Sequence, residues 1–273
     1  MAGQMTSASG THGSRAALRI AVIISIYVFM FFPIVIVIAT AFGEASLIEF
    51  PPSGFTLKWF SALGEPRWYN PFLTSLVLAV GSTLLSAIIG VPAAWALSRY
   101  DFRGREILKQ LFLAPLFVPW IITGVALLVA FNRAQMTGTF VAIFLGHIVV
   151  TIPYLVRSSL AGIEGLDKRL EDAAVSLGAT RFQVFRCVVV PAIRPSIIAG
   201  AIFGFLMSFD NVAVSIFLTN PTLTTVPIEM LNFVQWVMDP TISAVSTVYL
   251  LVALLALLVA DRWVGLRQFA GLR

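Results

Sequence analysis

The sequence has very few of the residues from which disulfide scaffolds, metal sites and soluble domains are built. Among 273 residues there are one cysteine, Cys187, and two histidines, His12 and His147. A single cysteine excludes a disulfide framework within the chain, and these three residues cannot form a metal-ligand cluster. Only 11% of the residues are charged and 59% are hydrophobic, whereas roughly a quarter of the residues in a soluble domain carry charge. The composition therefore predicts an integral membrane protein.

Recognised catalytic motifs are also missing. The sequence contains no Gly-x-x-x-x-Gly-Lys-Ser/Thr phosphate loop, no His-Glu-x-x-His and no Gly-x-Ser-x-Gly. We therefore expect neither an ATP site nor a catalytic centre in this chain. His147 lies in an apolar run, where hydrogen bonding between helices is the commoner role. The net charge of +5 could suggest nucleic acid, but the placement of the basic residues favours membrane topology.

Six apolar segments predict an all-α membrane protein with six transmembrane helices. The first, residues 20–41, runs for 22 uncharged residues, and about 20 suffice to cross a bilayer core. Cleavage of this segment as a signal peptide is the alternative, favoured by the triplet Ala39-Thr40-Ala41. The apolar region of a signal peptide usually has only about 7–15 residues, which favours a retained span. The other predicted spans are residues 71–97, 110–131, 139–159, 195–218 and 243–260.

The segments between and before the spans carry further signals. Residues 1–16 are rich in Ser, Thr and Gly and predict a disordered cytoplasmic tail. Pro115, Pro119 and Gly124 are expected to bend or loosen the third span, and Pro153 the fourth. Residues 219–240 lack basic side chains and place prolines where a short helix would begin and end. This pattern predicts a periplasmic or re-entrant helix between spans five and six.

The distribution of Lys and Arg predicts the orientation. Fifteen of the eighteen basic residues fall in the N-terminal tail, in residues 98–109, in residues 157–194 and in the C-terminal tail. Only Lys58, Arg67 and Arg133 lie on the other side. Because cytoplasmic loops are enriched in Lys and Arg, both termini are predicted to be cytoplasmic.

One long polar stretch, residues 166–191, interrupts the apolar pattern. Leu166, Leu170, Ala173 and Leu177 recur there at helical spacing. Acidic and basic residues, Glu171 among them, fall mainly elsewhere on the same helix, so an apolar stripe beside a charged face is expected.

Local signals predict where this helix ends and where the next begins. Gly178 can adopt a left-handed backbone and stop the first helix. Thr180 can cap a second helix that runs to Pro191. The stretch is therefore predicted to be a helix–turn–helix outside the bilayer.

The polar stretch resembles the cytoplasmic coupling loop of bacterial ABC importer permeases. That pattern is Glu-Ala-Ala, three residues, Gly, nine residues and Ile-x-Leu-Pro, and the chain has Asp172-Ala173-Ala174, Gly178 and Val188-Val189-Val190-Pro191 at the same spacing. Asp replaces Glu, Val replaces both Ile and Leu, and the neighbouring Glu171 leaves the register of the acidic residue open. In the family this loop docks into a groove on a cytoplasmic ATPase. The resemblance assigns ATPase coupling, within residues 161–193, to Leu170, Glu171, Asp172, Ala173, Ala174, Gly178 and Pro191.

Three other stretches are similar to one branch of these permeases, the second membrane subunit of spermidine/putrescine importers. They are residues 70–76, 98–104 and 208–215, and the resemblance covers nearly everything after residue 17. It implies a transmembrane domain over residues 17–270. Relatives on the same scaffold carry ferric iron, aminoethylphosphonate, opines or other small solutes, so these substrates remain alternatives to a polyamine.

The resemblance also implies partners and a location. The expected partners are a homologous second permease, a dimer of a cytoplasmic ABC ATPase that holds ATP and Mg, a periplasmic substrate-binding protein and membrane lipid, with no nucleic acid. The expected location is the bacterial inner membrane, with transport by alternating access. The chain itself is expected to be non-catalytic.

Asp210 is the residue that bears most directly on the solute. It lies near the middle of the predicted fifth span, where a carboxylate costs at least about 2.5–3.5 kcal/mol, so such a residue usually faces a cavity or a partner. With Ser208 and Asn211 as polar neighbours it is predicted to line the pathway, and Glu229 is predicted to act at the outer mouth. Acidic groups favour a cation, and we expect a polyamine; a purely structural partner for Asp210 is the alternative.

Two other functional classes remain open. A membrane-embedded enzyme would need convergent polar residues at membrane depth, and only Asp210 qualifies. A secondary transporter would typically show repeated broken helices, for which the sequence gives no clear sign.

Overall fold

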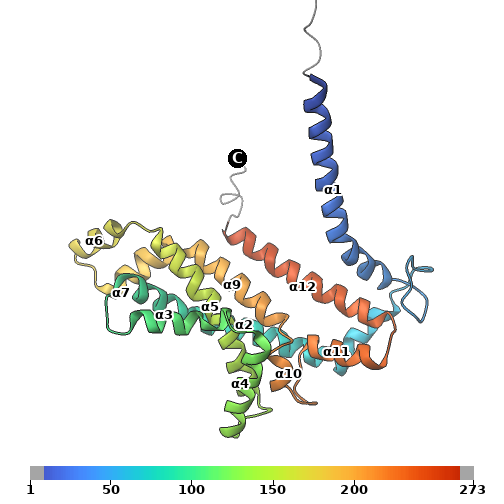
Figure 1. Ribbon diagram of the computed structural model, residues 1–273. Coiled ribbons are helices and arrows are strands. Elements are labelled where there is room, and N and C mark those ends of the chain that lie inside the picture. The colour runs from blue at the N-terminus through green and yellow to red at the C-terminus, as the bar shows by residue number, and fades with distance from the viewer. Residues whose placement is uncertain (1–8, 265–273) are drawn as a thin grey trace, which may run out of the picture. The chain divides into compact units, whose positions relative to one another are not determined.

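The structure is a computed structural model that describes residues 9–264 (Figure 1). Helices dominate, and within the described residues the only β-type pairing is an isolated bridge between Asn220 and Leu223. The larger helices are α1 (Ser9–Thr40), α2 (Pro66–Arg99), α3 (Arg105–Leu113), α4 (Trp120–Arg133), α5 (Phe140–Glu164), α6 (Lys168–Ser176), α9 (Arg194–Phe209), α11 (Val226–Trp236) and α12 (Thr241–Val264). The short ones are η1 (Lys58–Gly64), η2 (Ala114–Leu116), α7 (Arg181–Val184), the π-helical η3 (Phe185–Val189), α8 (Val190–Ala192) and α10 (Ser215–Leu218).

The chain forms two compact units. The described part of the first comprises residues 9–63 and 237–249, and that of the second comprises residues 64–236 and 250–264.

The first unit contains the long apolar helix α1. Its 32 residues include Pro33, and its apolar side chains from Leu18 to Val35 are almost all exposed. Residues Leu18–Thr40 are long and apolar enough to cross a membrane. The helix begins at Ser9, so the predicted disordered tail, residues 1–16, is wrong for residues 9–16, while residues 1–8 lie outside the described residues. Extending a helix that has already formed is far easier than nucleating one, and this lets α1 continue into a Ser- and Gly-rich segment.

The loop after α1 is held by aromatic and backbone contacts within the same unit. The Trp59 indole Nε1 donates to the Gly43 carbonyl oxygen at 2.8 Å. The ring of Phe42 lies 5.2 Å from that of Phe55 and 5.1 Å from that of Phe60. These contacts order a segment that has no long helix of its own.

Three helices, α2, α5 and α9, pack together in the second unit. Small residues allow this close approach. A Cβ atom on Gly200 would lie 3.0 Å from the Tyr154 carbonyl oxygen, and one on Gly90 would lie 3.3 Å from Leu155 Cβ. Glycine lets helix backbones approach closely in membrane proteins, where packing rather than the hydrophobic effect drives helix association.

The third predicted span, residues 110–131, is not one straight helix. Helix α3 with η2 meets α4 at an angle of 109°. The break falls at residues 117–119, and Pro119 stands at the N-cap of α4. Proline has no N–H to donate and its ring clashes with the preceding helical turn, so the predicted bend at Pro119 is confirmed as a break.

The fifth predicted span, residues 195–218, is also interrupted. Helix α9 ends at Phe209, and the short α10 begins only at Ser215. The side chain of Asn211 explains part of the break, because its Oδ1 accepts from the Val214 N–H at 2.8 Å and so replaces a helical carbonyl. The expectation that Asp210 lies within a continuous span is therefore wrong, since Asp210 is the C-cap of α9.

The number of spans depends on how the bent pairs are counted. Four described helices are long and apolar enough to cross a membrane, and there are up to six spans if α3 with α4 and α7–α8 with α9 each count as one. The all-α membrane class is confirmed. The short helix expected between the last two spans is confirmed as α11, which begins at Val226 and ends before Asp239.

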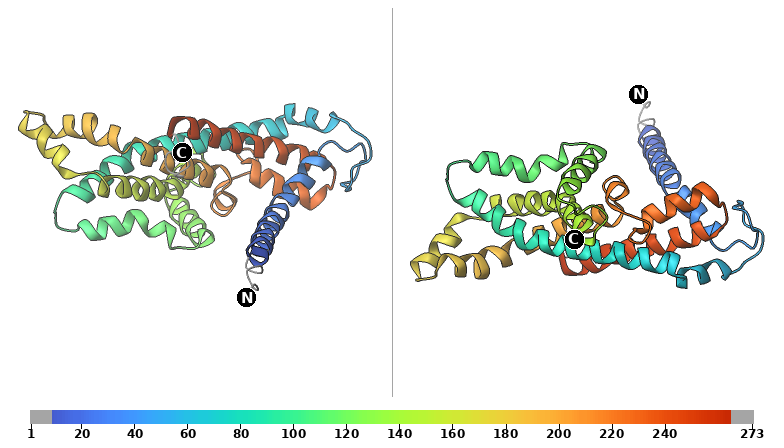
Figure 2. Two further views of the ribbon diagram at one scale, coloured as in Figure 1. Left: turned by 90° about the horizontal axis from the view of Figure 1, so that it is seen from above. Right: turned by 90° about the horizontal axis from the view of Figure 1, so that it is seen from below.

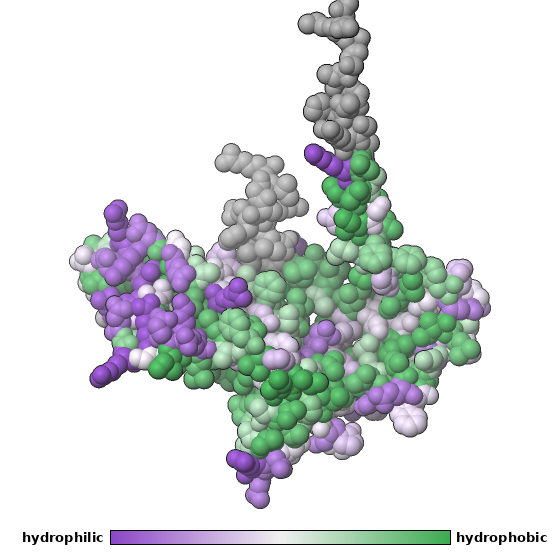
Figure 3. Space-filling view, viewed as in Figure 1, coloured by the Kyte–Doolittle hydropathy of each residue, from purple (hydrophilic) through white to green (hydrophobic). Residues whose placement is uncertain are grey.

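Helix α2 connects the two ends of the second unit (Figure 2). Its 34 residues correspond to a length of about 50 Å at 1.5 Å per residue. One end lies near α11, and the other lies near α6 and α7. Figure 3 shows hydrophilic residues gathered at the α6 and α7 end, with hydrophobic residues over the middle of the unit.

Candidate functional site

The turn after α6 has the geometry that the sequence predicts. Gly178 has φ +88°, in the left-handed region, and no atom lies within 4 Å of a Cβ built on it. The backbone angle, and not crowding, therefore calls for glycine. Thr180 and Gln183 then form a capping box, in which the Thr180 Oγ1 accepts from the Gln183 N–H and the Gln183 Oε1 accepts from the Thr180 N–H. Both predicted helix boundaries are confirmed.

The burial pattern of α6 is the reverse of that in a simple amphipathic helix, in which apolar side chains are buried and charged ones are exposed. Leu170 and Leu177 are exposed, Leu177 to 89%, whereas Glu171 is only 4% exposed. Asp172 and Ala173 are also exposed, and Ala174 packs partly against the core. The expectation that Glu171 belongs to the solvated charged face is therefore wrong.

An inward-facing partner explains the burial of Glu171. Its Oε1 accepts from Arg99 Nε at 2.6 Å, and its Oε2 accepts from the Trp95 indole Nε1 at 3.1 Å. The Arg99 side chain is 14% exposed and that of Glu171 is 5% exposed, so both charges are largely removed from water. A buried carboxylate needs such pairing, because desolvation of an unpaired charge is costly.

Arg99 also holds the end of α5. Its Nη2 donates to the carbonyl oxygens of Ile163 at 3.0 Å and Leu166 at 2.9 Å. These carbonyls belong to the last turn of α5 and to the connection that follows it, so one guanidinium joins α2, α5 and α6. We call the group Trp95, Arg99 and Glu171 the α6 clamp.

Apolar packing surrounds the clamp. Trp95 lies 5.1 Å from Phe185, ring centre to ring centre, which brings η3 against the end of α2. The buried cluster beside it contains Val91, Ala94, Leu97, Val156, Leu160, Ile163, Val184, Val189 and Ile193. Pro191 lies in α8, on the exposed side of this cluster. The loop assigned to ATPase coupling is thus a packed extension of α2 and α5.

The three residues predicted to line the pathway are placed differently from one another. Ser208 is buried and Asn211 nearly so, while Asp210 is exposed in this chain. Ser208 Oγ lies 3.2 Å from Ser82 Oγ, and Asn211 caps the break after α9. Asp210 forms no ion pair with the described part of the chain.

A buried polar network beside Asp210 centres on His147. Its Nδ1 lies 2.7 Å from Ser208 Oγ and its Nε2 lies 3.1 Å from Ser215 Oγ. The predicted role of His147, hydrogen bonding between helices, is confirmed. Ser86 Oγ extends the polar interior through a 2.5 Å contact with Thr151 Oγ1. The regular spacing of Ser82 and Ser86 on α2 was the available sequence signal for this network.

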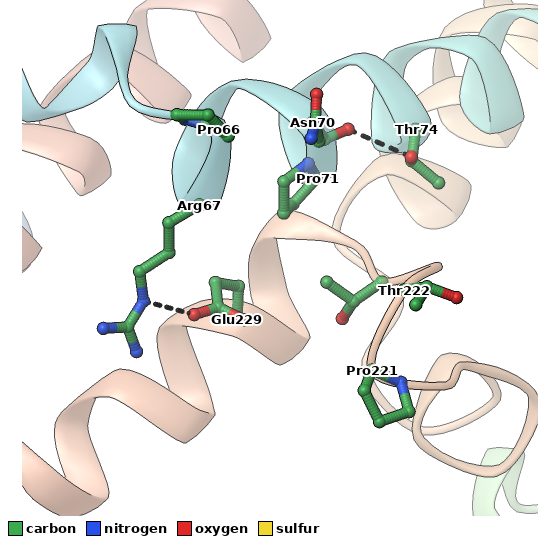
Figure 4. Close-up of a pocket in the computed structure, with 9 residues that line it drawn as sticks. Pro66, Arg67, Asn70, Pro71, Thr74, Pro221, Thr222 and Glu229 are labelled. Carbon is green, nitrogen blue, oxygen red and sulfur yellow. Dashed lines mark hydrogen bonds and ion pairs between the residues drawn. The ribbon is translucent and has the colours of Figure 1, made fainter.

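Glu229 lies on α11, beside a cavity of about 500 Å³ (Figure 4). Its Oε1 accepts from Arg67 Nε at 2.6 Å. In the sequence, Arg67 contributes only to the topology prediction and carries no signal of a link to Glu229. The two residues are 162 positions apart, and no local pattern links them.

Potential metal ligands do not gather in this chain as far as it is described. No group of three or more His, Cys, Asp or Glu side chains lies close enough together to hold an ion among residues 18–259. The polar groups of the second unit instead form the α6 clamp, the His147 network and the Arg67–Glu229 pair.

Comparison with known proteins agrees with these features. The family described as binding-protein-dependent transport system inner membrane component matches residues 86–268. The spermidine/putrescine transport system permease protein PotC of Escherichia coli (strain K12) is 30% identical over 238 residues, covering 87% of this chain and 90% of that protein. The putrescine transport system permease protein PotI of the same strain is 28% identical over 249 residues, covering 86% of each chain.

Solved structures show the same fold. A bacterial ABC transporter involved in the import of the acidic polysaccharide alginate has a chain that superposes with a TM-score of 0.73. The alignment covers 96% of this chain and 99% of that one, at 13% sequence identity. The chain belongs to the family of binding-protein-dependent inner membrane transport components, and it is a non-catalytic, multi-pass permease subunit of an ABC importer.

Proposed function

We propose that this permease imports a cationic amine of the polyamine class, spermidine or putrescine, and that Asp210 contacts the solute during transport. The observation that carries the proposal is the position of Asp210 at the C-cap of α9, exposed, where the span is broken. A helix C-terminus carries partial negative charge, which adds to that of the carboxylate. Broken helices of this kind often provide cation sites in transporters.

The neighbours of Asp210 support a fixed position for the carboxylate. Ser208 and Asn211 use their side chains within the chain, Ser208 with His147 and Asn211 with the Val214 N–H. They hold the break in place and leave Asp210 as the group that meets the solute. The similarity to PotC and PotI favours a polyamine over ferric iron, aminoethylphosphonate or an opine.

The coupling role is assigned to the exposed surface of α6 and the turn after it. Leu170, Asp172 and Leu177 project outward, while the α6 clamp fixes the helix from inside. An apolar surface with an acidic group suits a groove on a partner protein. In our proposal the partner is a cytoplasmic ABC ATPase dimer that holds ATP and Mg, together with a homologous second permease and a periplasmic substrate-binding protein.

Alternating access then follows from how α6 is attached. Because Arg99 joins α6 to both α2 and α5, closure of the ATPase dimer would move these three helices together. In our proposal the bundle changes shape at the break between α3 and α4 and at the break between α9 and α10. This scheme places the chain in a bacterial inner membrane with both termini in the cytoplasm.

The test uses the complete complex, reconstituted with its second permease, ATPase and binding protein. A panel of spermidine, putrescine, ferric iron, aminoethylphosphonate and an opine is assayed for uptake and for stimulation of ATP hydrolysis. We expect stimulation by polyamines, and its loss with Asp210→Asn but not with Asp101→Asn, an exposed acid near the α6 end of the unit. Stimulation by a different solute alone, or unchanged polyamine uptake in Asp210→Asn, would overturn the proposal.

A further inference from the structure

The cavity beside Glu229 lies at the opposite end of the second unit from the α6 clamp. It is bordered by the start of α2 and by residues 221–229, which lead into α11 (Figure 4). Arg67 and Arg99 are 32 residues apart on α2, which corresponds to about 48 Å along a straight helix. In the proposed function α6 meets the cytoplasmic ATPase, which puts this cavity on the periplasmic side, where solute arrives.

The chain places its own cation at this cavity. The Arg67 guanidinium donates to Glu229, and its Cζ lies 4.8 Å from the centre of the Phe233 ring. The Phe233 ring is itself fixed edge-on against Trp68 at 5.1 Å. A carboxylate beside an aromatic face is a favourable environment for an ammonium or guanidinium group.

The two charged groups differ in how firmly they are held. The Glu229 side chain is 15% exposed, whereas that of Arg67 is 46% exposed. Ion pairs with one partner this exposed contribute little net stability, because the long side chain can return to water at small cost. Glu229 is therefore the fixed member of the pair and Arg67 the displaceable one.

A second observation indicates that the cavity can take a ligand. Thr224 lines it, and the Thr224 Oγ1 is buried without a hydrogen-bond partner in the described part of the chain. Buried hydroxyl groups are rarely left unpaired in native proteins. The oxygen itself is covered, so the Thr224 side chain must rotate about χ1 to turn its hydroxyl toward a donor in the cavity.

We propose that Glu229 is the anchor of an outer site for a primary ammonium group, and that Arg67 occupies this anchor until the solute displaces it. The proposal rests on the proposed transport of a cationic amine. The compact ammonium brings three donors, which suffice for the Glu229 carboxylate and the Thr224 hydroxyl. The displaced Arg67 side chain turns into the surrounding water.

This exchange predicts opposite effects for the two partners of one ion pair. Arg67→Gln removes the internal competitor, so spermidine should bind more tightly, by up to about fivefold, which is what a surface ion pair is worth. Glu229→Gln removes the anchor and should weaken binding by about fivefold or more. A purely structural pair between α2 and α11 would give both variants the same direction of change.

The experiment measures occupancy at the cavity itself in the assembled complex. Thr222→Cys, at the rim, is introduced into a Cys187→Ser background and labelled with a maleimide while spermidine is varied. The half-protecting spermidine concentration is compared for the parent, Arg67→Gln, Glu229→Gln and the control Glu65→Gln, an exposed acid at the start of α2. Relative to the parent, we expect the half-protecting concentration to be lower in Arg67→Gln, higher in Glu229→Gln and unchanged in Glu65→Gln. The uncharged 1,4-butanediol should give no protection.

The outcomes separate this inference from the proposed function. Shifts in the same direction for Arg67→Gln and Glu229→Gln, or no protection at all, would overturn the ammonium site even if polyamine uptake is intact. Protection with opposite shifts would support the site even in a complex whose hydrolysis is stimulated by another amine. Protection by 1,4-butanediol would show that the cavity does not select for charge and would also overturn the site.

Discussion

Arg99 Nε and Glu171 Oε1 lie 2.6 Å apart and join the end of α2 to the inner face of α6. The acidic residue of the pair directly precedes Asp172, which faces outward. Two adjacent acids are therefore placed differently: Glu171 fixes α6 to α2 and α5, and the exposed Asp172 is the one that our proposal assigns to the ATPase. The similarity to the family pattern left this register open, and the burial of Glu171 distinguishes the two residues.

Replacing Glu171 with Ala should release α6. The change leaves the Arg99 guanidinium and the Trp95 indole without their carboxylate, and breaking a buried pair in this way costs about 3–5 kcal/mol. Hydrogen exchange of residues 166–180 should become faster, and ATP-driven uptake should fall. Asp172→Asn is the matched control, because it should weaken ATPase binding without changing the exchange rates. Equal protection of α6 in Glu171→Ala and in the parent protein would contradict the clamp.

Reversing the charges should not restore the clamp. In Arg99→Glu combined with Glu171→Arg, a glutamate at position 99 cannot donate to the carbonyl oxygens of Ile163 and Leu166, which Arg99 now satisfies. We expect uptake to stay low in the double variant, although the ion pair itself could form. Full recovery of uptake would show that only the pair, and not the attachment to α5, matters.

Gly178→Val should uncouple transport from hydrolysis while leaving the spans inserted. A β-branched residue at φ +88° is strained by roughly 1–2 kcal/mol or more, which would shift the turn after α6. ATPase activity that no longer responds to the loaded binding protein is the expected result. Gly165→Ala is the control, since Gly165 has an ordinary right-handed backbone at φ −78°. Coupled uptake in Gly178→Val would refute the role of the turn.

His147→Phe should destabilise the α5–α9 contact. Ser208 would keep Ser82 as a partner, but the buried Ser215 hydroxyl would lose its contact with His147, at about 1–3 kcal/mol for a group left unsatisfied. The thermal midpoint of the purified complex should fall. The decrease should be smaller for His147→Gln, because glutamine keeps a donor and an acceptor. Similar midpoints for the Phe variant and the parent would argue against a structural network.

Thiol labelling can test the orientation predicted from the basic residues. In a Cys187→Ser background, Ser61→Cys should react with an impermeant reagent from the periplasm, and Arg103→Cys only from the cytoplasm. Both positions are exposed in the structure, so access depends on the side of the membrane. The opposite pattern would reverse the orientation and remove the coupling assignment of α6.

Several features of this protein are determined by the sequence itself because they arise from neighbouring residues. The apolar runs alone establish an all-α membrane protein. Gly178 ends α6 through its own backbone freedom, and Thr180 caps α7 through a residue three positions away. Pro227 likewise marks the first turn of α11. Each of these signals acts within one or two helical turns, so it can be interpreted before the chain is folded.

Tertiary structure alone decided which polar groups meet. Helical periodicity predicted a solvated position for Glu171, because periodicity contains no information about the arginine and tryptophan that α2 brings against this residue. The apolar pattern also predicted a continuous fifth span through Asp210. The hydrogen bond from the Val214 N–H to the Asn211 side chain, which accompanies the break, is known only from the folded structure. Glu229 and Arg67 are 162 residues apart. Partner choice depends on distances through space and on the cost of burying charge, and neither is encoded by local spacing.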